Sequence, residues 1–207
     1  MMHCPAGAKY IMNSDTAICT PLEAVLCTEE LQTRAARAPS DEAVNRAMIA
    51  LAKELATSPK HGLQHLVETA LRLCGAHSAG ISILEEDDDG REMFRWHALA
   101  GHFAPHVNSL IPRDFSPCGT VLDRSSPLLM KRLDRYYTEF AKVSPRIEEV
   151  LLVPFRVGEV TRGTIWVIAH DEQVHFDAED LRIMTELARF AAEACSLLDA
   201  LPPEVTF

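Results

Sequence analysis

The sequence lacks any run of apolar residues long enough to cross a membrane. A transmembrane helix needs about 18 such residues in succession, whereas the longest apolar segments here, Leu151–Phe155 and Thr164–Ala169, have the length of β-strands. The first ten residues also lack the basic stretch and apolar run of a secretion signal. We therefore expect a cytoplasmic protein with no membrane partner.

Basic residues are also scarce. The chain has 20 lysines and arginines against 30 aspartates and glutamates, which gives a formal net charge of -10 at pH 7. Nucleic-acid binding needs a basic face that contacts phosphates, so we expect no nucleic-acid partner. The densest acidic cluster, Glu85–Asp89, runs into Asp89-Gly90, which is typical of a solvated hairpin turn and lacks the ligand spacing of a calcium loop.

The familiar motifs of catalysis and metal binding are missing. There is no glycine-rich phosphate loop, no G-x-S-x-G pattern and no paired acid/base motif. The histidines His97, His102, His106 and His170 have no cysteine or carboxylate at ligand spacing, so we expect no metal site, and the sequence points to no particular cofactor. The six cysteines form no C-x-x-C pair and are expected to be free thiols: Cys4, Cys19, Cys27, Cys74, Cys118 and Cys195.

What is present is the composition of a globular protein, with 47 % hydrophobic and 24 % charged residues. Apolar residues spaced by three and four predict a helix over Asp41–Ala56, capped by Ser40 or by its own first residue. Ser58 as a cap, with Pro59 at the first helical position, predicts a second helix that ends at Gly75.

The sequence patterns that predict helices are weak near the N-terminus and strong near the C-terminus. Residues 1–40 are expected to form an extension, with one short helix over Thr20–Leu31 and a linker over Ala35–Ser40. Near the other end, Asp177 followed by Asp180 is a capping-box pattern, and the apolar stripe that follows predicts a long last helix.

The first strands follow the second predicted helix. Ala79–Leu84 and Arg91–Leu99 predict an antiparallel hairpin around the acidic turn. Because side chains alternate along a strand, Phe94, Trp96 and Ala98 are expected on one face.

A second hairpin is predicted from Leu151–Val157 and Gly163–His170. Between the hairpins lies an irregular, proline-rich segment in which we expect a short helix over Ser116–Asp123 and a short strand over Pro127–Met130. Hairpins imply an antiparallel sheet, and long terminal helices would cover one face of it while the irregular segment covers the other. The predicted fold class is therefore α/β, of the α+β kind, with a ligand pocket between that segment and the sheet.

Several segments resemble one known family. The closing stretch has Val153-Pro154-Phe155, then Gly163–Val167, then Phe176 before an acidic helix start. The stretch AGISIL at Ala79–Leu84 resembles a first strand, and PRDFSPCG at 112–119 resembles a segment of modules found ahead of bacterial histidine kinases. Together with the order of elements, these segments resemble the GAF domain family, whose plan is shared with PAS domains.

The resemblance spans about residues 41–201 and implies a domain organisation with an N-terminal extension over 1–40, a GAF-like sensory domain over 41–201 and a tail over 202–207. It implies a non-enzymatic sensory module of bacterial-type signal transduction that binds an unknown small molecule and repacks its terminal helices in response. It also implies a homodimer through those helices. Because the chain ends just after its last helix, we expect its output to act in trans on a signalling protein.

The candidate site combines aromatic strand residues with the PRDFSPCG segment. If Ser116 caps a helix, free backbone N–H groups face the loop, and Arg113 adds a donor suited to a carboxylate or phosphate. The plainer alternatives are that Arg113 pairs with Asp114 or a neighbour and that the aromatic rings belong to the core. The candidate ligand-binding residues are Phe94, Trp96, Arg113, Asp114, Ser116, Cys118, Phe155 and Trp166.

Cys118 opens a second hypothesis. In the first turn of a helix, the dipole lowers the pKa of a thiol, which suits a thiol-based redox sensor or an enzyme resembling methionine-sulfoxide reductases, GAF proteins with Cys-Gly in this region. That family has partner cysteines a short way upstream, and none lies between Cys74 and Cys118. Cys118 could also attach a bilin covalently, as the resemblance to phytochrome-like GAF domains implies. Those domains typically have a histidine directly after the cysteine, whereas Gly119 follows Cys118 here. The alternatives are a small packing residue and, for the whole chain, a ligand-free protein-interaction scaffold with a collapsed pocket.

Overall fold

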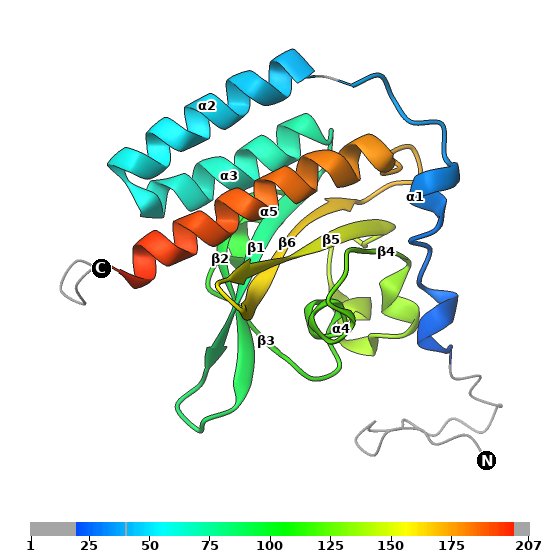
Figure 1. Cartoon of the computed structure of the whole chain (residues 1–207). Helices are drawn as coiled ribbons and strands as arrows, with labels where there is room; N and C mark the ends of the chain where they lie inside the picture. Colours follow the sequence, from blue (N-terminus) through cyan, green and yellow to red (C-terminus); the bar gives the residue numbers. More distant parts are fainter. Residues whose placement is uncertain (1–19, 40, 201–207) are drawn as a thin grey trace.

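The computed structural model describes residues 20–39 and 41–200 (Figure 1). The predicted cap at Ser40 and the thiols of Cys4 and Cys19 lie outside the described residues. A six-stranded antiparallel sheet forms the centre, in the order β3-β2-β1-β6-β5-β4. This confirms the predicted α+β class. The strands are β1 (Ser78–Glu86), β2 (Glu92–Gly101), β3 (Leu110–Pro112), β4 (Leu128–Lys131), β5 (Glu149–Val157) and β6 (Val160–Ala169).

The long helices lie together on one face of the sheet (Figure 1). Helices α3 (Pro59–Leu73) and α5 (Ala178–Asp199) pack on the strands, and α2 (Asp41–Thr57) packs mainly on α3 and α5. The predicted capping box at the start of α5 is present: the Asp177 side chain accepts from the backbone of Asp180, whose side chain accepts from the Asp177 backbone. Four orphan N–H groups at a helix start make such caps necessary.

The irregular segment covers the other face. It contains α4 (Pro117–Arg124) and three short 3-10 helices, η2 (Ala104–His106), η3 (Leu133–Arg135) and η4 (Thr138–Lys142). The sheet therefore separates two hydrophobic cores, one under the helices and one under the irregular segment. Strand alternation sorts residues between them: on β5, Leu151 and Val153 enter the helix-side core, whereas Val150 and Leu152 enter the other, which we call the loop-side core.

The prediction that Phe94, Trp96 and Ala98 share one face of β2 is wrong for Ala98. Ile81 of β1 pairs with Ala98, and the next residue, Ser82, pairs with Trp96, so His97 is an extra residue in the ladder. Such a bulge reverses the alternation of side chains. Phe94 and Trp96 face the loop-side core as predicted, but Ala98 faces the helix-side core.

The single helix predicted over Thr20–Leu31 is also wrong. The chain forms a 3-10 helix η1 (Leu22–Ala24), then a β-bridge between Leu26 and Met130, and then a one-turn helix α1 (Glu30–Thr33). The sequence around residues 20–31 could not predict the β-bridge, because its partner, Met130 at the edge of β4, lies far away in the sequence. We call residues 20–37, which run along β4 toward α5 (Figure 1), the strap.

Candidate functional site

A cavity of about 30 Å³ lies in the loop-side core, beneath α4 and the short 3-10 helices. Strands β2, β5 and β6 form its floor, and the irregular segment forms its cover. Within this cover, Tyr137 links the 3-10 helices to α4, because its hydroxyl lies 2.6 Å from Oγ1 of Thr120. Burial raises the pKa of Tyr137 to about 12, so the hydroxyl stays protonated. The lining residues are Trp96, Phe103, Ile111, Ser116, Pro117, Cys118, Leu133, Phe140, Ile147, Val150, Leu152, Trp166 and Ile168.

Four of the predicted site residues meet at this cavity: Trp96, Ser116, Cys118 and Trp166. The two tryptophan rings lie 5.5 Å apart between centroids. They are the two tryptophans of the chain, so any change of the cavity alters the environment of every tryptophan in the protein. Phe94 is buried in the same core without lining the cavity.

Phe155 lies elsewhere. It belongs to the helix-side core with Leu151 and Val153, because all three occupy odd positions of β5 and therefore share a face. The alternation that separates Phe155 from Val150 and Leu152 was visible in the sequence.

Arg113 and Asp114 do not line the cavity. The Arg113 guanidinium donates to Asp123 at 2.5 Å and pairs with Glu92 at 3.3 Å and with Asp114 at 3.6 Å. The hydrogen bond to Asp123 is the main cause of a raised pKa for Arg113. This is the arrangement of the plainer alternative, in which Arg113 holds the loop together through carboxylates around it.

The start of α4 is built as the sequence predicts. The Ser116 side chain accepts a hydrogen bond from the Gly119 backbone at 3.0 Å and donates to the Arg113 carbonyl at 2.9 Å. A β-carbon at Gly119 would lie 2.0 Å from that same carbonyl oxygen. The loop before α4 thus approaches the helix so closely that no larger residue fits, and the cap is fully engaged within the chain.

Four polar groups are buried together between α4 and the sheet. The Trp166 indole donates to Ser82 Oγ at 2.9 Å, and the Cys118 thiol contacts the same oxygen at 3.6 Å. Thr164 Oγ1 donates to the Cys118 sulfur at 3.2 Å. Buried polar groups need partners, and here each has one inside the network.

Burial overturns the expectation that the helix start lowers the thiol pKa of Cys118. Desolvation raises that pKa, and the contacts with Thr164 and Ser82 offset it only in part. We expect Cys118 to resist maleimide in the native protein at pH 7.5 and to react once the chain is unfolded in urea. Mapping of labelled peptides by mass spectrometry measures this, with the urea-unfolded chain as the comparison. Rapid native labelling of Cys118 would contradict the burial argument.

Three histidines, His77, His102 and His170, gather at one edge of the sheet, directly before β1 and directly after β2 and β6. His170 lies 6.1 Å from His77 and 5.3 Å from His102 between ring centroids, and 5.0 Å from Phe103, which lines the cavity. His170 Nδ1 donates to the Arg146 carbonyl at 2.8 Å. Its Nε2 lies 2.8 Å from the Ser78 hydroxyl, which also accepts from the Phe103 amide.

This setting favours neutral His170. Its pKa is lowered by desolvation first, and also by His102 and His77, while Arg146 O and Asp171 oppose the shift. A lowered folded-state pKa means that the unfolded chain binds the proton first, so stability falls as pH decreases from the ordinary histidine value of about 6.5 toward the folded pKa.

We therefore expect His170→Gln to lose less stability than the wild type between pH 7.5 and pH 5. Urea unfolding at each pH measures the difference. The comparison variant is His61→Gln, which makes the same substitution at an exposed position on α3. Equal slopes for the wild type and His170→Gln would remove His170 as a cause of acid sensitivity.

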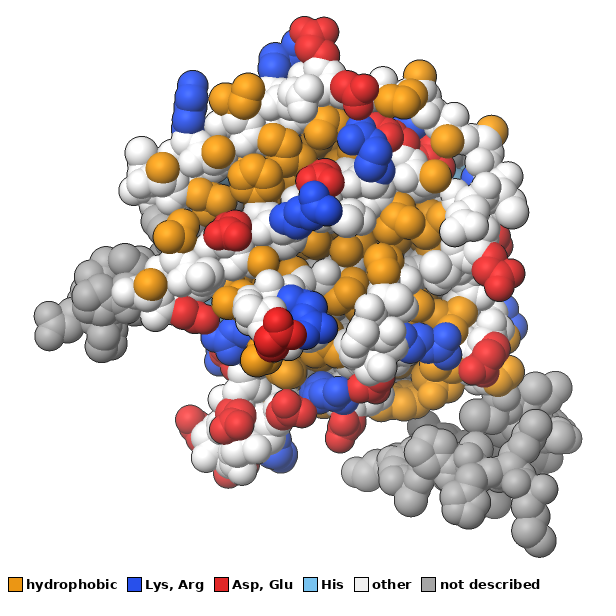
Figure 2. Space-filling model, in the orientation of Figure 1, with side chains coloured by type: hydrophobic (Ala, Val, Ile, Leu, Met, Phe, Trp, Pro, Cys, Tyr) orange, Lys and Arg blue, Asp and Glu red, His pale blue; other side chains and the backbone are white. Residues whose placement is uncertain are grey.

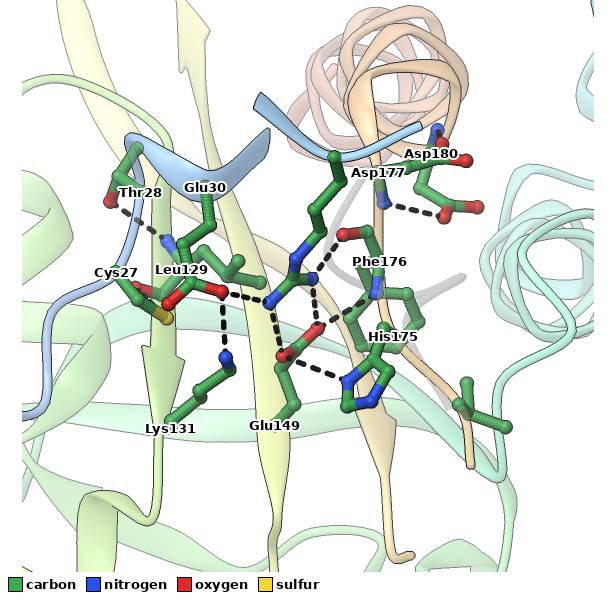
Figure 3. A network of polar contacts seen from close by, with 12 residues as sticks. Cys27, Thr28, Glu30, Leu129, Lys131, Glu149, His175, Phe176, Asp177 and Asp180 are labelled. Atoms are coloured by element: carbon green, nitrogen blue, oxygen red, sulfur yellow. Dashed lines mark hydrogen bonds and ion pairs between the residues drawn. The ribbon is translucent and has the colours of Figure 1, made fainter. Parts of the chain in front are cut away.

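The strap is held by a buried ion pair that sequence reasoning missed (Figure 3). Glu149, whose side chain is 2 % exposed, accepts two hydrogen bonds of 2.8 Å from the Arg34 guanidinium. Glu149 also accepts the Phe176 amide at 2.7 Å, and Arg34 donates to the Phe176 carbonyl. Glu30 bridges Arg34 and Lys131, with hydrogen bonds of 2.7 and 2.6 Å. No local pattern signals a pair separated by 115 positions.

Further contacts join the strap to α5. The Arg37 amide donates to the Asp177 carboxylate at 2.8 Å, and the Arg37 guanidinium pairs with Asp180. Burial raises the pKa of Asp180 to about 6, although Arg37 opposes the shift. The strap therefore contacts the edge of β4, the first residue of β5 and the cap of α5.

A second, larger cleft of about 320 Å³ lies beside this network. It is lined by charged groups that are already paired, among them Lys131 with Glu30 and Arg132 with Asp134 and Glu148. A ligand there would have to compete with these pairs, so the apolar cavity is the better candidate. Among the described residues, no helix has the length and apolar character of a membrane span, and no group of histidine, cysteine or carboxylate side chains is placed to hold a metal ion.

Comparison with known proteins gives the following matches. The GAF domain family model matches residues 56–195. The second GAF domain of DevS from Mycobacterium smegmatis has a TM-score of 0.55 and 22 % identity, covering 69 % of this chain and 96 % of that one. Free methionine-R-sulfoxide reductase from Neisseria meningitidis, in complex with its substrate, has a TM-score of 0.62 and 16 % identity, covering 81 % and 99 %.

The phycoerythrobilin-bound GAF domain of a cyanobacterial phytochrome has a TM-score of 0.54 and 10 % identity, covering 79 % of this chain and 100 % of that one. At these identities the solved structures show a shared fold alone. A comparison with curated proteins finds no match.

Proposed function

Because this chain belongs to the GAF domain family, we propose that it is a sensory module that binds a small molecule in the cavity beneath α4. The observation that carries the proposal is the position of this cavity between the sheet and a cover of short 3-10 helices and loops, lined by aromatic and aliphatic side chains. Ligand sites commonly have such apolar, aromatic walls.

In this proposal the sheet transmits occupancy to the helices. Val150 lines the cavity, and its neighbour Glu149 holds both the strap and the Phe176 backbone at the start of α5. A shift of β5 on ligand binding therefore moves the α5 cap, and α2 and α5 repack. The ligand acts through the different free energies of the two arrangements, as any population shift requires.

The proposed output surface is the helical layer. Ile49 on α2 is 58 % exposed and Leu197 on α5 is 43 % exposed, and apolar side chains gather over this layer in Figure 2. We place a homodimer contact here, with a signalling protein of the histidine-kinase type acted on in trans, in the cytoplasm. Sedimentation of wild type and Ile49→Glu tests the dimer, which the substitution should weaken.

The test of ligand binding is the mass of the purified protein under native and then denaturing conditions. A heavier native species supports the proposal, and the mass difference defines the ligand. Equal masses from cells grown under several conditions, with no visible absorbance band, would count against it.

One observation favours a second candidate function. A cavity of about 30 Å³ holds about one or two water molecules, as expected for a scaffold that binds only a partner protein.

The remaining alternative is a thiol enzyme. One structural neighbour is a sulfoxide reductase, but Cys118 is buried with a raised pKa. Turnover of free methionine sulfoxide, abolished by Cys118→Ser, would instead establish the enzyme.

A further inference from the structure

We infer that the cavity takes a small uncharged aromatic molecule and excludes anions such as carboxylates and phosphates. This inference rests on the proposed function and narrows it to one chemical class. It depends on three properties of the site: the absence of charge on its walls, the pairing of its polar atoms, and the arrangement of its rings.

No charged side chain lines the cavity among the residues that the structure describes. The cation that the sequence offered for an anionic ligand, Arg113, is paired with Asp123, Glu92 and Asp114 instead. An ionised ligand would lose its hydration in this cavity without gaining a counter-ion, and that loss costs far more than the apolar contacts return.

The polar side-chain atoms at the cavity already have hydrogen-bond partners. Ser116 both donates and accepts, and Cys118 and the Trp166 indole share the Ser82 oxygen. Among the described residues, the buried side-chain atom without a hydrogen-bond partner is Oγ1 of Thr69, on α3 and outside the cavity. A carboxylate or phosphate would therefore find no free side-chain donor here.

Three rings define the shape of the site. Trp96, Phe103 and Trp166 lie 5.5 to 6.3 Å apart between centroids, two of the three pairs tilted or edge-on. An aromatic ligand that packs on these rings in a tilted or edge-on geometry gains stabilisation beyond that of the area it buries, which an alkyl chain does not. Because the cavity measures only about 30 Å³, entry of a ring requires the cover to move outward, which limits the ligand to small molecules.

The test uses three probes with one ring and different charge: benzyl alcohol, benzoate and benzylammonium. Tryptophan emission and melting temperature are followed on the full-length protein. We expect benzyl alcohol to bind at least about tenfold more tightly than either ion, since tenfold corresponds to about 1.4 kcal/mol and an unpaired buried charge costs more.

Two matched variants locate the binding. Val150→Ile adds one methylene on the cavity face of β5, and Val153→Ile adds the same group on the opposite face. The first should weaken benzyl alcohol binding about tenfold or more, and the second should leave it unchanged. Equal weakening by both variants would overturn the inference, because binding would then not depend on the cavity.

The remaining outcomes separate this inference from the proposed function. If an ion binds as tightly as the alcohol and Val150→Ile abolishes its binding, the uncharged class is wrong while ligand binding at the cavity stands. If no probe binds, the inference is overturned, and the proposed function is decided independently by the native and denatured masses.

Discussion

Arg34→Ala is expected to lower the free energy of unfolding by about 3–5 kcal/mol, the range found when one partner of a buried ion pair is removed. Glu149 would keep its Phe176 amide but lose both guanidinium hydrogen bonds in a site where its side chain is 2 % exposed. The strap would also lose its contact with the Phe176 carbonyl. Urea unfolding followed by tryptophan emission measures the effect.

Two further variants identify the cause. Adding Glu149→Gln to Arg34→Ala removes the stranded charge and keeps an acceptor for the Phe176 amide, so it should restore about 2 kcal/mol. Arg46→Ala breaks an ion pair with Glu42 whose side chains are 67 % and 87 % exposed, and exposed pairs contribute less than about 1 kcal/mol. A loss for Arg34→Ala no larger than that for Arg46→Ala would show that the ion pair between Arg34 and Glu149 does not hold the strap.

Gly119→Ala is expected to destabilise the protein by about 3 kcal/mol, the upper part of the usual range for overpacking. Alanine normally stabilises a helix interior by about 1 kcal/mol relative to glycine, so the expected sign is opposite to helix propensity. The cause is the Arg113 carbonyl oxygen, 2.0 Å from the new β-carbon, which forces the loop and α4 apart. Thermal unfolding and tryptophan emission both measure the change.

The control is Gly90→Ala in the acidic hairpin turn. Gly90 has a φ of +76° and open space around its β-carbon position, so alanine meets only backbone strain there, about 1–2 kcal/mol. It should also leave the emission spectrum unchanged. If Gly119→Ala proved neutral or stabilising, the close approach of loop and helix would have to be abandoned.

Local signals in the sequence predicted much of the fold. The Ser58-Pro59, Ser116-Pro117 and Asp177–Asp180 patterns each mark the start of an observed helix, because a helix start depends on a few neighbouring residues. Ser116 and Asp177 cap their helices with their side chains, whereas Ser58 stands at the cap position without a side-chain hydrogen bond. Hairpins are equally local, and the acidic turn joins β1 and β2 as expected.

The site was predicted less completely, since its assembly depends on distant parts of the chain. Trp96 and Trp166 meet because β1 lies between β2 and β6 and a bulge sets the register. Phe155 was placed with them, although strand alternation puts it on the other face. The partners of Arg113 include Glu92 and Asp123, on a strand and a helix whose proximity no spacing rule gives.

The strap affects where a fragment or a fusion of this protein should begin. The family match begins at residue 56, yet the counter-ion of Glu149 stands at Arg34. The borders of a family model follow what its members share, whereas the borders of a folding unit fall where few contacts cross from one side to the other. A fragment trimmed to the shared part would contain the whole sheet and the whole cavity, but it would lack both Arg34, the ion-pair partner of Glu149, and the rest of the strap along β4. In gene fusions, domain exchanges or crystallisation fragments of this protein, the unit to move therefore starts upstream of the strap.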